Sequence, residues 1–210
     1  MLQYTAISKT TLELLKALMQ EECLKEFNLV GGTALALQMG HRISIDLDLF
    51  TVYDFNPQII LSELRNKYEI SGISESAFSL IQYIEFPVNS QNFVKVDMIK
   101  YPYKLLKPPI LMDGIRLLSV DDIIPMKLSA IGSRGSKKDF YDIYFLLRAY
   151  SFKEMFQLFE QKFPSVNYFH ILKSLTYFDD AENELNPNTI EKISWLNVKK
   201  EIEKQVKKIG

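Results

Sequence analysis

Three stretches within the first 118 residues have the apolar spacing or composition of helices. Asn56-Pro57 precedes the third of them and suits an N-cap followed by a first helical position. Gly40 follows the second, where a glycine commonly ends a helix. The pattern therefore predicts helices over about 10–24 (beginning at Thr10 or Thr11), over 33–39, and from 57 to about 68.

Between these helices lie runs that are rich in β-branched and aromatic residues, and several of them alternate between apolar and polar positions. Asn89-Ser90-Gln91-Asn92 is a turn-like sequence between two such runs, and Asp113-Gly114 is a strong two-residue hairpin signal between two others. The pattern predicts two single strands and two hairpins: 27–30, 43–51, 78–88 with 93–101, and 110–111 with 115–118.

After Ser119 the spacing of apolar residues is helical up to the C-terminus. Asp122 follows Ser119 by three residues, which resembles a capping box with aspartate in place of glutamate or glutamine. We therefore expect an α+β protein, with a mixed α/β domain over 1–118 and a helical domain over 119–210. Breaks between the helices are expected near 132–136, 150–151, 164–166 and 179–188.

The composition is that of an ordinary globular protein: 47% of the 210 residues are hydrophobic and 24% are charged. The formal net charge of −1 excludes a global positive field that would attract nucleic acid, but not a local basic patch. Cys23 is the single cysteine, which excludes an internal disulfide and a cysteine-based zinc site. No apolar run approaches the roughly 18 residues of a membrane span, and no signal peptide is visible. We expect a cytoplasmic protein without a membrane partner.

Two aspartates interrupt the apolar strand predicted over 43–51. Asp46 and Asp48 are two residues apart and therefore point to the same face of a strand. Adjacent carboxylates repel each other, and a divalent cation such as Mg²⁺ or Mn²⁺ removes this repulsion because it prefers oxygen ligands. The alternative interpretation is a strand with one solvated face.

Gly31-Gly32 stands between a predicted strand and a predicted helix. Glycines there let the backbone approach a phosphate, the helix N-terminus offers free N–H groups, and Thr33 adds a hydroxyl. Asp97 lies in a third strand, on the same face as Lys95. The sequence therefore predicts a phosphate-binding turn beside a cluster of carboxylates, which suits two-metal chemistry on a phosphoryl group.

Two stretches of the chain resemble motifs of a known family. Residues 31–50, GGTALALQMGHRISIDLDLF, resemble the first motif of the AbiEii/AbiGii nucleotidyltransferase toxins, which belong to the DNA polymerase β-like superfamily. Residues 126–147, MKLSAIGSRGSKKDFYDIYFLL, resemble their later motif of a lysine, a basic stretch and Lys-Asp-x-x-Asp on a helix. The resemblance spans most of 25–150.

The resemblance implies a polymerase β-like nucleotidyltransferase domain with a mixed sheet, followed by helices. It implies metal-dependent transfer of a nucleoside monophosphate from an NTP, with release of pyrophosphate, by the toxin of a toxin–antitoxin or abortive-infection pair. Some relatives modify the acceptor end of tRNA, so we consider tRNA as an acceptor and a cognate antitoxin as a partner.

The implied residue roles fall into two groups. The triphosphate is assigned to Gly31, Gly32, Thr33, Arg42 and Lys127, and the metal to Asp46, Asp48 and Asp97. Lys127 and Asp139 match the essential lysine and the later aspartate of the family, and with the three metal-binding aspartates they form the predicted catalytic set.

The later motif leaves alternatives open. Lys127 suits neutralisation of a triphosphate as a point charge, or it is a surface lysine. Asp139 and Asp142 share a helix face, and Asp142 either joins the site or is a first-turn carboxylate favoured by the helix dipole.

Two other functions compete with that of a toxin enzyme. One is a nucleotide- or RNA-binding regulator that keeps the fold but has no catalytic activity. The other is a nucleotidyltransferase with a small-molecule acceptor. The complete set of Asp46, Asp48, Asp97, Lys127 and Asp139 argues against the regulator.

Overall fold

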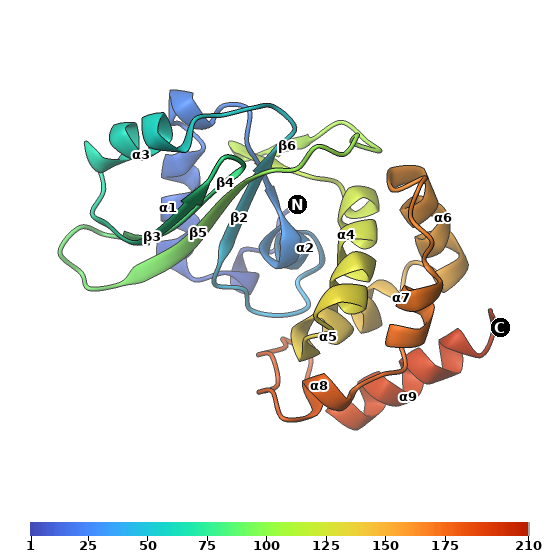
Figure 1. The fold of residues 1–210 in the computed structure, drawn as a ribbon. Helices are drawn as coiled ribbons and strands as arrows, with labels where there is room; N and C mark the ends of the chain where they lie inside the picture. The colour runs from blue at the N-terminus through green and yellow to red at the C-terminus, as the bar shows by residue number, and fades with distance from the viewer. Residues whose placement is uncertain (210) are drawn as a thin grey trace. The chain divides into compact units, whose positions relative to one another are not determined.

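The described residues, 1–209 of a computed structural model, form two compact units. The first consists of Met1–Lys104 and Pro108–Leu118, and the second of Leu105–Lys107 and the chain from Ser119 onward. The first unit contains all the strands and the second is helical (Figure 1). The predicted α+β class, a mixed sheet followed by helices, is thereby confirmed.

The first unit is built on a seven-stranded sheet with the order β3-β4-β5-β2-β1-β7-β6 (Figure 1). β2 runs parallel to β5 and β1 runs parallel to β7, whereas the other neighbours are antiparallel. The strands are β1 (Asn28–Val30), β2 (Leu47–Thr51), β3 (Ile70–Ser76), β4 (Ser79–Glu85), β5 (Phe93–Lys100), β6 (Ile110–Met112) and β7 (Ile115–Leu117).

Both predicted hairpins are present. β4 pairs with β5, and β6 pairs with β7 across Asp113-Gly114. Asp113 and Gly114 have φ angles of +52° and +79°, as a two-residue turn between antiparallel strands requires. β3 is not among the predicted strands, because its sequence ISGISES is mostly polar and exposed; it lies at the sheet edge and pairs with β4.

The helices of the first unit are α1 (Lys9–Leu18), α2 (Gly31–Met39) and α3 (Pro57–Arg65), with 3-10 turns η1 (Tyr4–Ala6) and η2 (Glu22–Leu24). The predicted end of the first helix at Leu24 is wrong. The chain turns after Leu18, and Glu21 accepts hydrogen bonds from Lys67 and Tyr68 beyond α3. The N-cap is Ser8, whose hydroxyl accepts the Thr11 N–H, and not a threonine.

The second unit contains α4 (Val120–Ser133), α5 (Lys137–Leu146), α6 (Phe152–Lys162), α7 (Phe169–Ser174), α8 (Asp179–Glu182) and α9 (Trp195–Val206). Ser119 caps α4 by accepting the N–H of Asp122, as the sequence indicates. The predicted break at 179–188 contains the short helix α8. None of the helices in residues 1–209 combines the length and the apolar character needed to cross a membrane.

A fully buried ion pair joins two helices of the second unit. Lys162 of α6 lies 2.8 Å from Oδ1 of Asp122 on α4, and neither side chain has exposed surface. Asp122 also accepts the backbone N–H groups of Leu106 and Lys107 at 2.8 and 3.0 Å, and the hydroxyl of Ser119 at 2.9 Å. One carboxylate thus attaches the segment 105–107, the start of α4 and the end of α6 to one another.

Candidate active site

The two glycines form the first turn of α2. β1 ends at Val30 and α2 begins at Gly31, so no separate turn connects the strand to the helix. Gly31 has a φ of +67°, in the region that favours glycine. N–H groups in a first turn have no partner within the helix, so this turn can bind an anion such as a phosphate.

Thr33 is 1% exposed, and its hydroxyl faces the protein interior. The hydroxyl donates to the backbone carbonyl of Asp46 and lies 2.8 Å from the hydroxyl of Ser44. These contacts connect α2 to the segment before β2 and fix the backbone that carries Asp46. Contact between Thr33 and a triphosphate stays a prediction.

Both glycines leave room for charged side chains. A Cβ at Gly31 would lie 3.1 Å from Cγ of Asp48 and closer still to its Oδ2. A Cβ at Gly32 would collide with the guanidinium of Arg42. The absence of side chains at these two positions therefore lets a carboxylate and a guanidinium pack against the start of α2.

We expect Gly31→Ala to destabilise the protein by about 1–3 kcal/mol, the usual cost of a left-handed non-glycine residue. The same change should lower any transferase activity by about a hundredfold, because Asp48 must move away from the new Cβ. Urea unfolding and an activity assay measure the two effects. Gly114→Ala is the matched control: φ is +79° there, but a Cβ would meet only Gln20 Nε2 at 3.8 Å. Equal activity losses in the two variants would contradict this explanation.

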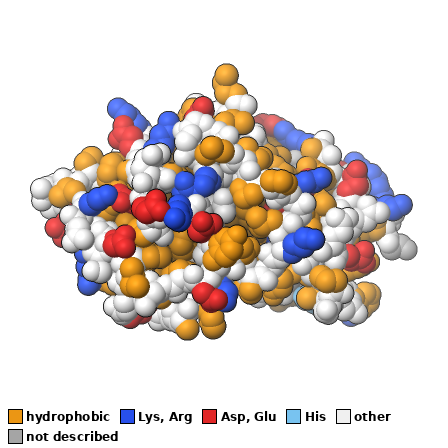
Figure 2. Space-filling view, turned by 90° about the horizontal axis from the view of Figure 1, so that it is seen from above, with side chains coloured by type: hydrophobic (Ala, Val, Ile, Leu, Met, Phe, Trp, Pro, Cys, Tyr) orange, Lys and Arg blue, Asp and Glu red, His pale blue; other side chains and the backbone are white. Residues whose placement is uncertain are grey.

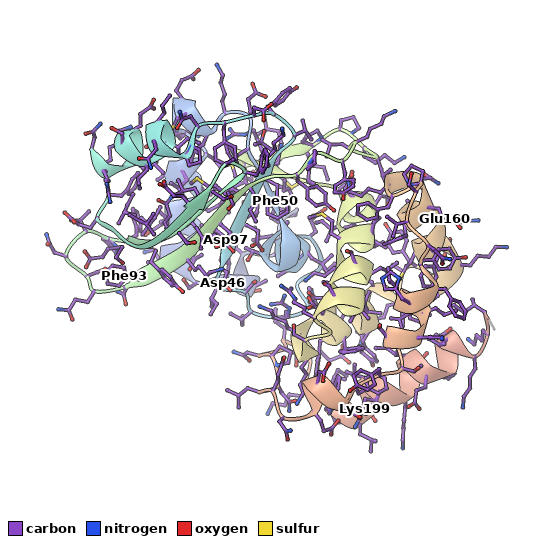
Figure 3. All side chains as sticks on the ribbon, in the orientation of Figure 1. Asp46, Phe50, Phe93, Asp97, Glu160 and Lys199 are labelled. Carbon is purple, nitrogen blue, oxygen red and sulfur yellow. The ribbon has the colours of Figure 1, made fainter. Side chains whose placement is uncertain are left out.

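The three predicted metal-binding aspartates lie on one face of the sheet. Asp48 of β2 is the register partner of Asp97 on the parallel strand β5. Asp46 directly precedes β2, two residues from Asp48 and on the same side of the chain. Figure 3 labels Asp46 and Asp97 next to each other beside β2 and β5. The predicted strand over 43–51 thus begins later, at Leu47, and Asp46 lies just outside it.

Lys95 pairs with the carboxylate cluster, which consists of Asp46, Asp48 and Asp97. Its Nζ lies 2.6 Å from Oδ2 of Asp97, and its side chain is 33% exposed. Burial lowers the pKa of Lys95, but the hydrogen bond to Asp97 and the negative charges of all three aspartates outweigh burial and raise it. The alternation along the strand predicted that Lys95 and Asp97 share a face, and their spacing of two residues was the signal for this pair.

One carboxylate oxygen of Asp97 makes no hydrogen bond in the described part of the chain. Oδ1 is buried and has no hydrogen-bond partner within residues 1–209. A buried carboxylate oxygen without a partner is costly, and it is suited to bind a cation or to accept a proton.

The donor types therefore fit Mg²⁺ or Mn²⁺, since all three side chains supply carboxylate oxygens. Among residues 1–209, however, no three His, Cys, Asp or Glu side chains converge in an arrangement that could hold a metal ion. The cation in contact with Asp97 is the ammonium of Lys95. A metal site with Asp46, Asp48 and Asp97 as its three ligands requires the contact between Lys95 and Asp97 to break.

The later motif forms a buried charge cluster within the second unit. Lys127 is 5% exposed, and its Nζ lies 3.1 Å from Asp139 Oδ1 and 2.5 Å from Asp142 Oδ2. Arg134 and Ser136 donate to Asp139 at 2.8 and 2.9 Å. Burial raises the pKa of Asp139, but the charges of Lys127 and Arg134 and the hydrogen bond from Arg134 lower it below its usual value. The neighbouring cations therefore favour the ionised form of Asp139.

These contacts exclude two of the simpler alternatives. Lys127 is not a surface lysine, because two carboxylates surround its ammonium. Asp142 is not a first-turn carboxylate, because it is the sixth residue of α5 and is fully buried. Both aspartates of the motif pair with Lys127, and the predicted catalytic role of Asp139 stays a prediction.

Two basic residues near the motifs are also buried. Arg42 is 5% exposed, and its Nη1 lies 3.3 Å from the carbonyl of Ile43 and 3.4 Å from Oγ of Ser44. Lys137 is 4% exposed and donates to the carbonyls of Glu182 and Glu184. On the face of the molecule shown in Figure 2, basic and acidic side chains are interspersed among apolar ones.

Comparison with known proteins gives one family match. The family model described as nucleotidyl transferase AbiEii toxin, type IV toxin–antitoxin system, matches residues 13–208. An uncharacterized protein of Aquifex aeolicus (strain VF5) is 34% identical over 185 residues, which cover 85% of this chain and 86% of the relative.

Solved structures share the fold. A crystal structure from Helicobacter pylori has a TM-score of 0.57 at 17% identity and covers 97% of this chain and 99% of its own. MenT4, a nucleotidyltransferase toxin from Mycobacterium tuberculosis H37Rv, has a TM-score of 0.55 at 12% identity and covers 91% of this chain and 78% of its own. At these identities the likeness concerns the fold, and it confirms the nucleotidyltransferase fold predicted from the two motifs.

Proposed function

The chain belongs to the AbiEii family of nucleotidyltransferase toxins of type IV toxin–antitoxin systems, and from this premise we propose that it transfers a nucleoside monophosphate to tRNA. The donor is an NTP, pyrophosphate is released, and the reaction depends on a divalent cation. A cognate antitoxin controls the toxin.

One observation supports this proposal most strongly: the Asp48 carboxylate packs against the first turn of α2 and lies beside Asp97 in the sheet. An anion bound by the N–H groups of that turn comes close to these carboxylates. Asp46, Asp48 and Asp97 would hold Mg²⁺ or Mn²⁺, which supplies positive charge for the triphosphate and the leaving pyrophosphate. The combination suits chemistry on a nucleoside triphosphate better than a solvated strand does.

In the proposed reaction, the acceptor hydroxyl attacks the α-phosphorus of the NTP. The bond from the α-phosphorus to the bridging oxygen breaks, and that oxygen leaves with pyrophosphate. Asp97 Oδ1, which is buried and without a hydrogen-bond partner in residues 1–209, accepts the proton of the hydroxyl. The first turn of α2 orients the phosphates.

We assign Lys127 to the charge of the triphosphate, as the family motif implies. Asp139 and Asp142 fix the position of its ammonium, and Arg134 and Ser136 in turn orient Asp139. The role of the two aspartates in this proposal is to position Lys127.

Transfer of label from each α-³²P-NTP into total bacterial tRNA, with Mg²⁺ or Mn²⁺, tests the proposal. We expect label from at least one NTP to enter tRNA, and EDTA to abolish the transfer. Metal-dependent NTP binding without label in tRNA would contradict tRNA as acceptor and favour a small-molecule acceptor. NTP binding without transfer to any acceptor would favour the regulator. The absence of NTP binding would contradict the enzyme altogether.

A further inference from the structure

We infer that Lys95 is a built-in counter-ion of the carboxylate cluster, and that a divalent cation binds there only by displacing the Lys95 ammonium from Asp97. Lys95 is then a positioning residue: it holds the carboxylates together without metal and lowers the affinity for metal. This inference rests on the proposed metal-dependent function and deepens it.

The geometry of β5 supports the inference that Lys95 is a counter-ion of the carboxylate cluster. Lys95 and Asp97 are two residues apart, so both side chains lie on one face of the strand, and their charged atoms are 2.6 Å apart. The parallel register places Asp48 beside Asp97 on that same face. The ammonium is thus on the side of the sheet to which the carboxylates point.

The contacts of the two Asp97 oxygens support the inference that a metal ion displaces Lys95. Oδ2 is engaged by Lys95, and Oδ1 is buried without a hydrogen-bond partner in the described residues. A metal ion that uses Asp97 as a ligand must compete with the ammonium for the same carboxylate. The two cations are close in position and like in charge, so they do not share the site.

The charges set the direction of the effect. Removal of the Lys95 ammonium makes this face of the sheet more negative by one charge and leaves Asp97 without the cation that contacts it. The carboxylates should then bind a divalent cation more strongly, and the metal-free fold should be less stable. The pair is one third exposed on the lysine side, so solvent moderates both effects.

The test compares Lys95→Met and Lys95→Arg with the wild type. The matched control is Lys100→Met, which removes another lysine of β5 whose Nζ lies 2.5 Å from the exposed Asp54. Lys100 lies five residues from Lys95 and therefore on the other face of the strand. Mn²⁺ affinity is measured by the electron paramagnetic resonance of free Mn²⁺, and unfolding temperature is measured in EDTA and in Mg²⁺.

We expect Lys95→Met to bind Mn²⁺ about tenfold more tightly than the wild type, which corresponds to loss of one partly screened ion pair. Its unfolding temperature should fall in EDTA and recover in Mg²⁺. Lys95→Arg should bind Mn²⁺ no more tightly than the wild type, because the guanidinium engages a carboxylate with two donors. Lys100→Met should match the wild type in Mn²⁺ affinity.

If the wild type binds Mn²⁺ and Lys95→Met binds it equally or more weakly, the inference is wrong while the proposed function stands. If neither protein binds Mn²⁺, the proposed metal site fails and the inference fails with it. If Lys95→Met does not fold in either buffer, Lys95→Arg decides: Mn²⁺ binding tighter than that of the wild type overturns the inference.

Discussion

Replacement of Asp48 by asparagine is expected to reduce nucleotidyl transfer by about a thousandfold, equivalent to about 4 kcal/mol of transition-state stabilisation. Asparagine keeps the shape of the side chain, so its packing against Gly31 persists, but the negative charge that would hold a divalent cation is lost. Label transfer from α-³²P-NTP measures the loss of activity, and thermal unfolding without metal shows whether the variant is folded.

Asp54→Asn is the matched control for this variant. Asp54 follows β2, its side chain is 84% exposed, and it pairs with Lys100 rather than with the carboxylate cluster. We expect wild-type transfer from it. If Asp48→Asn retained more than a tenth of the wild-type activity, the assignment of the metal to this face of the sheet would be wrong.

The second large effect concerns stability. We expect Asp122→Ala to lower the free energy of unfolding by about 3–5 kcal/mol, because it removes the carboxylate that lies 2.8 Å from the fully buried ammonium of Lys162. The backbone N–H groups of Leu106 and Lys107 and the hydroxyl of Ser119 also lose their acceptor. Urea unfolding followed by circular dichroism measures the loss.

Lys162→Met distinguishes the two ends of this ion pair. Asp122 would keep three donors after that change, and methionine fills much of the space of the lysine stem, so we expect a smaller loss than for Asp122→Ala. Glu191→Ala removes an exposed pair with Arg148 in the same unit and should leave stability unchanged. A larger loss for Lys162→Met than for Asp122→Ala would show that the hydrogen bonds to the carboxylate contribute little.

Local signals in the sequence predicted several element boundaries well. Asn56 caps α3 through its side chain, Ser119 caps α4, and Asp113-Gly114 forms the turn between β6 and β7. Each of these signals acts within about four residues, so the chain needs no distant contact to follow it. The end of α1 was missed because a contact of Glu21 with Lys67, 46 residues away, accompanies the turn there.

The candidate site was also predicted in part from the sequence and in part only from the structure. The alternation around Asp46 and Asp48 and the Gly-Gly pair indicated which residue types carry chemistry. The two motifs implied the family, which the match over residues 13–208 establishes. The sequence left the role of Asp142 open, and the structure gives it a partner, Lys127, 15 positions earlier in the chain.

The sequence by itself therefore determined most of the helices and strands, though not β3 or α8, the shared face of Asp46 and Asp48, and the resemblance to a family. Those properties follow from the periods of helix and strand and from motifs in a single stretch of chain. Tertiary structure alone decided that Asp48 packs on Gly31, that Asp97 lies beside Asp48, and that Lys162 pairs with Asp122. Hydrogen bonds and ion pairs depend on atoms a few ångströms apart, and the separation of residues along the chain does not specify which of them the fold brings together.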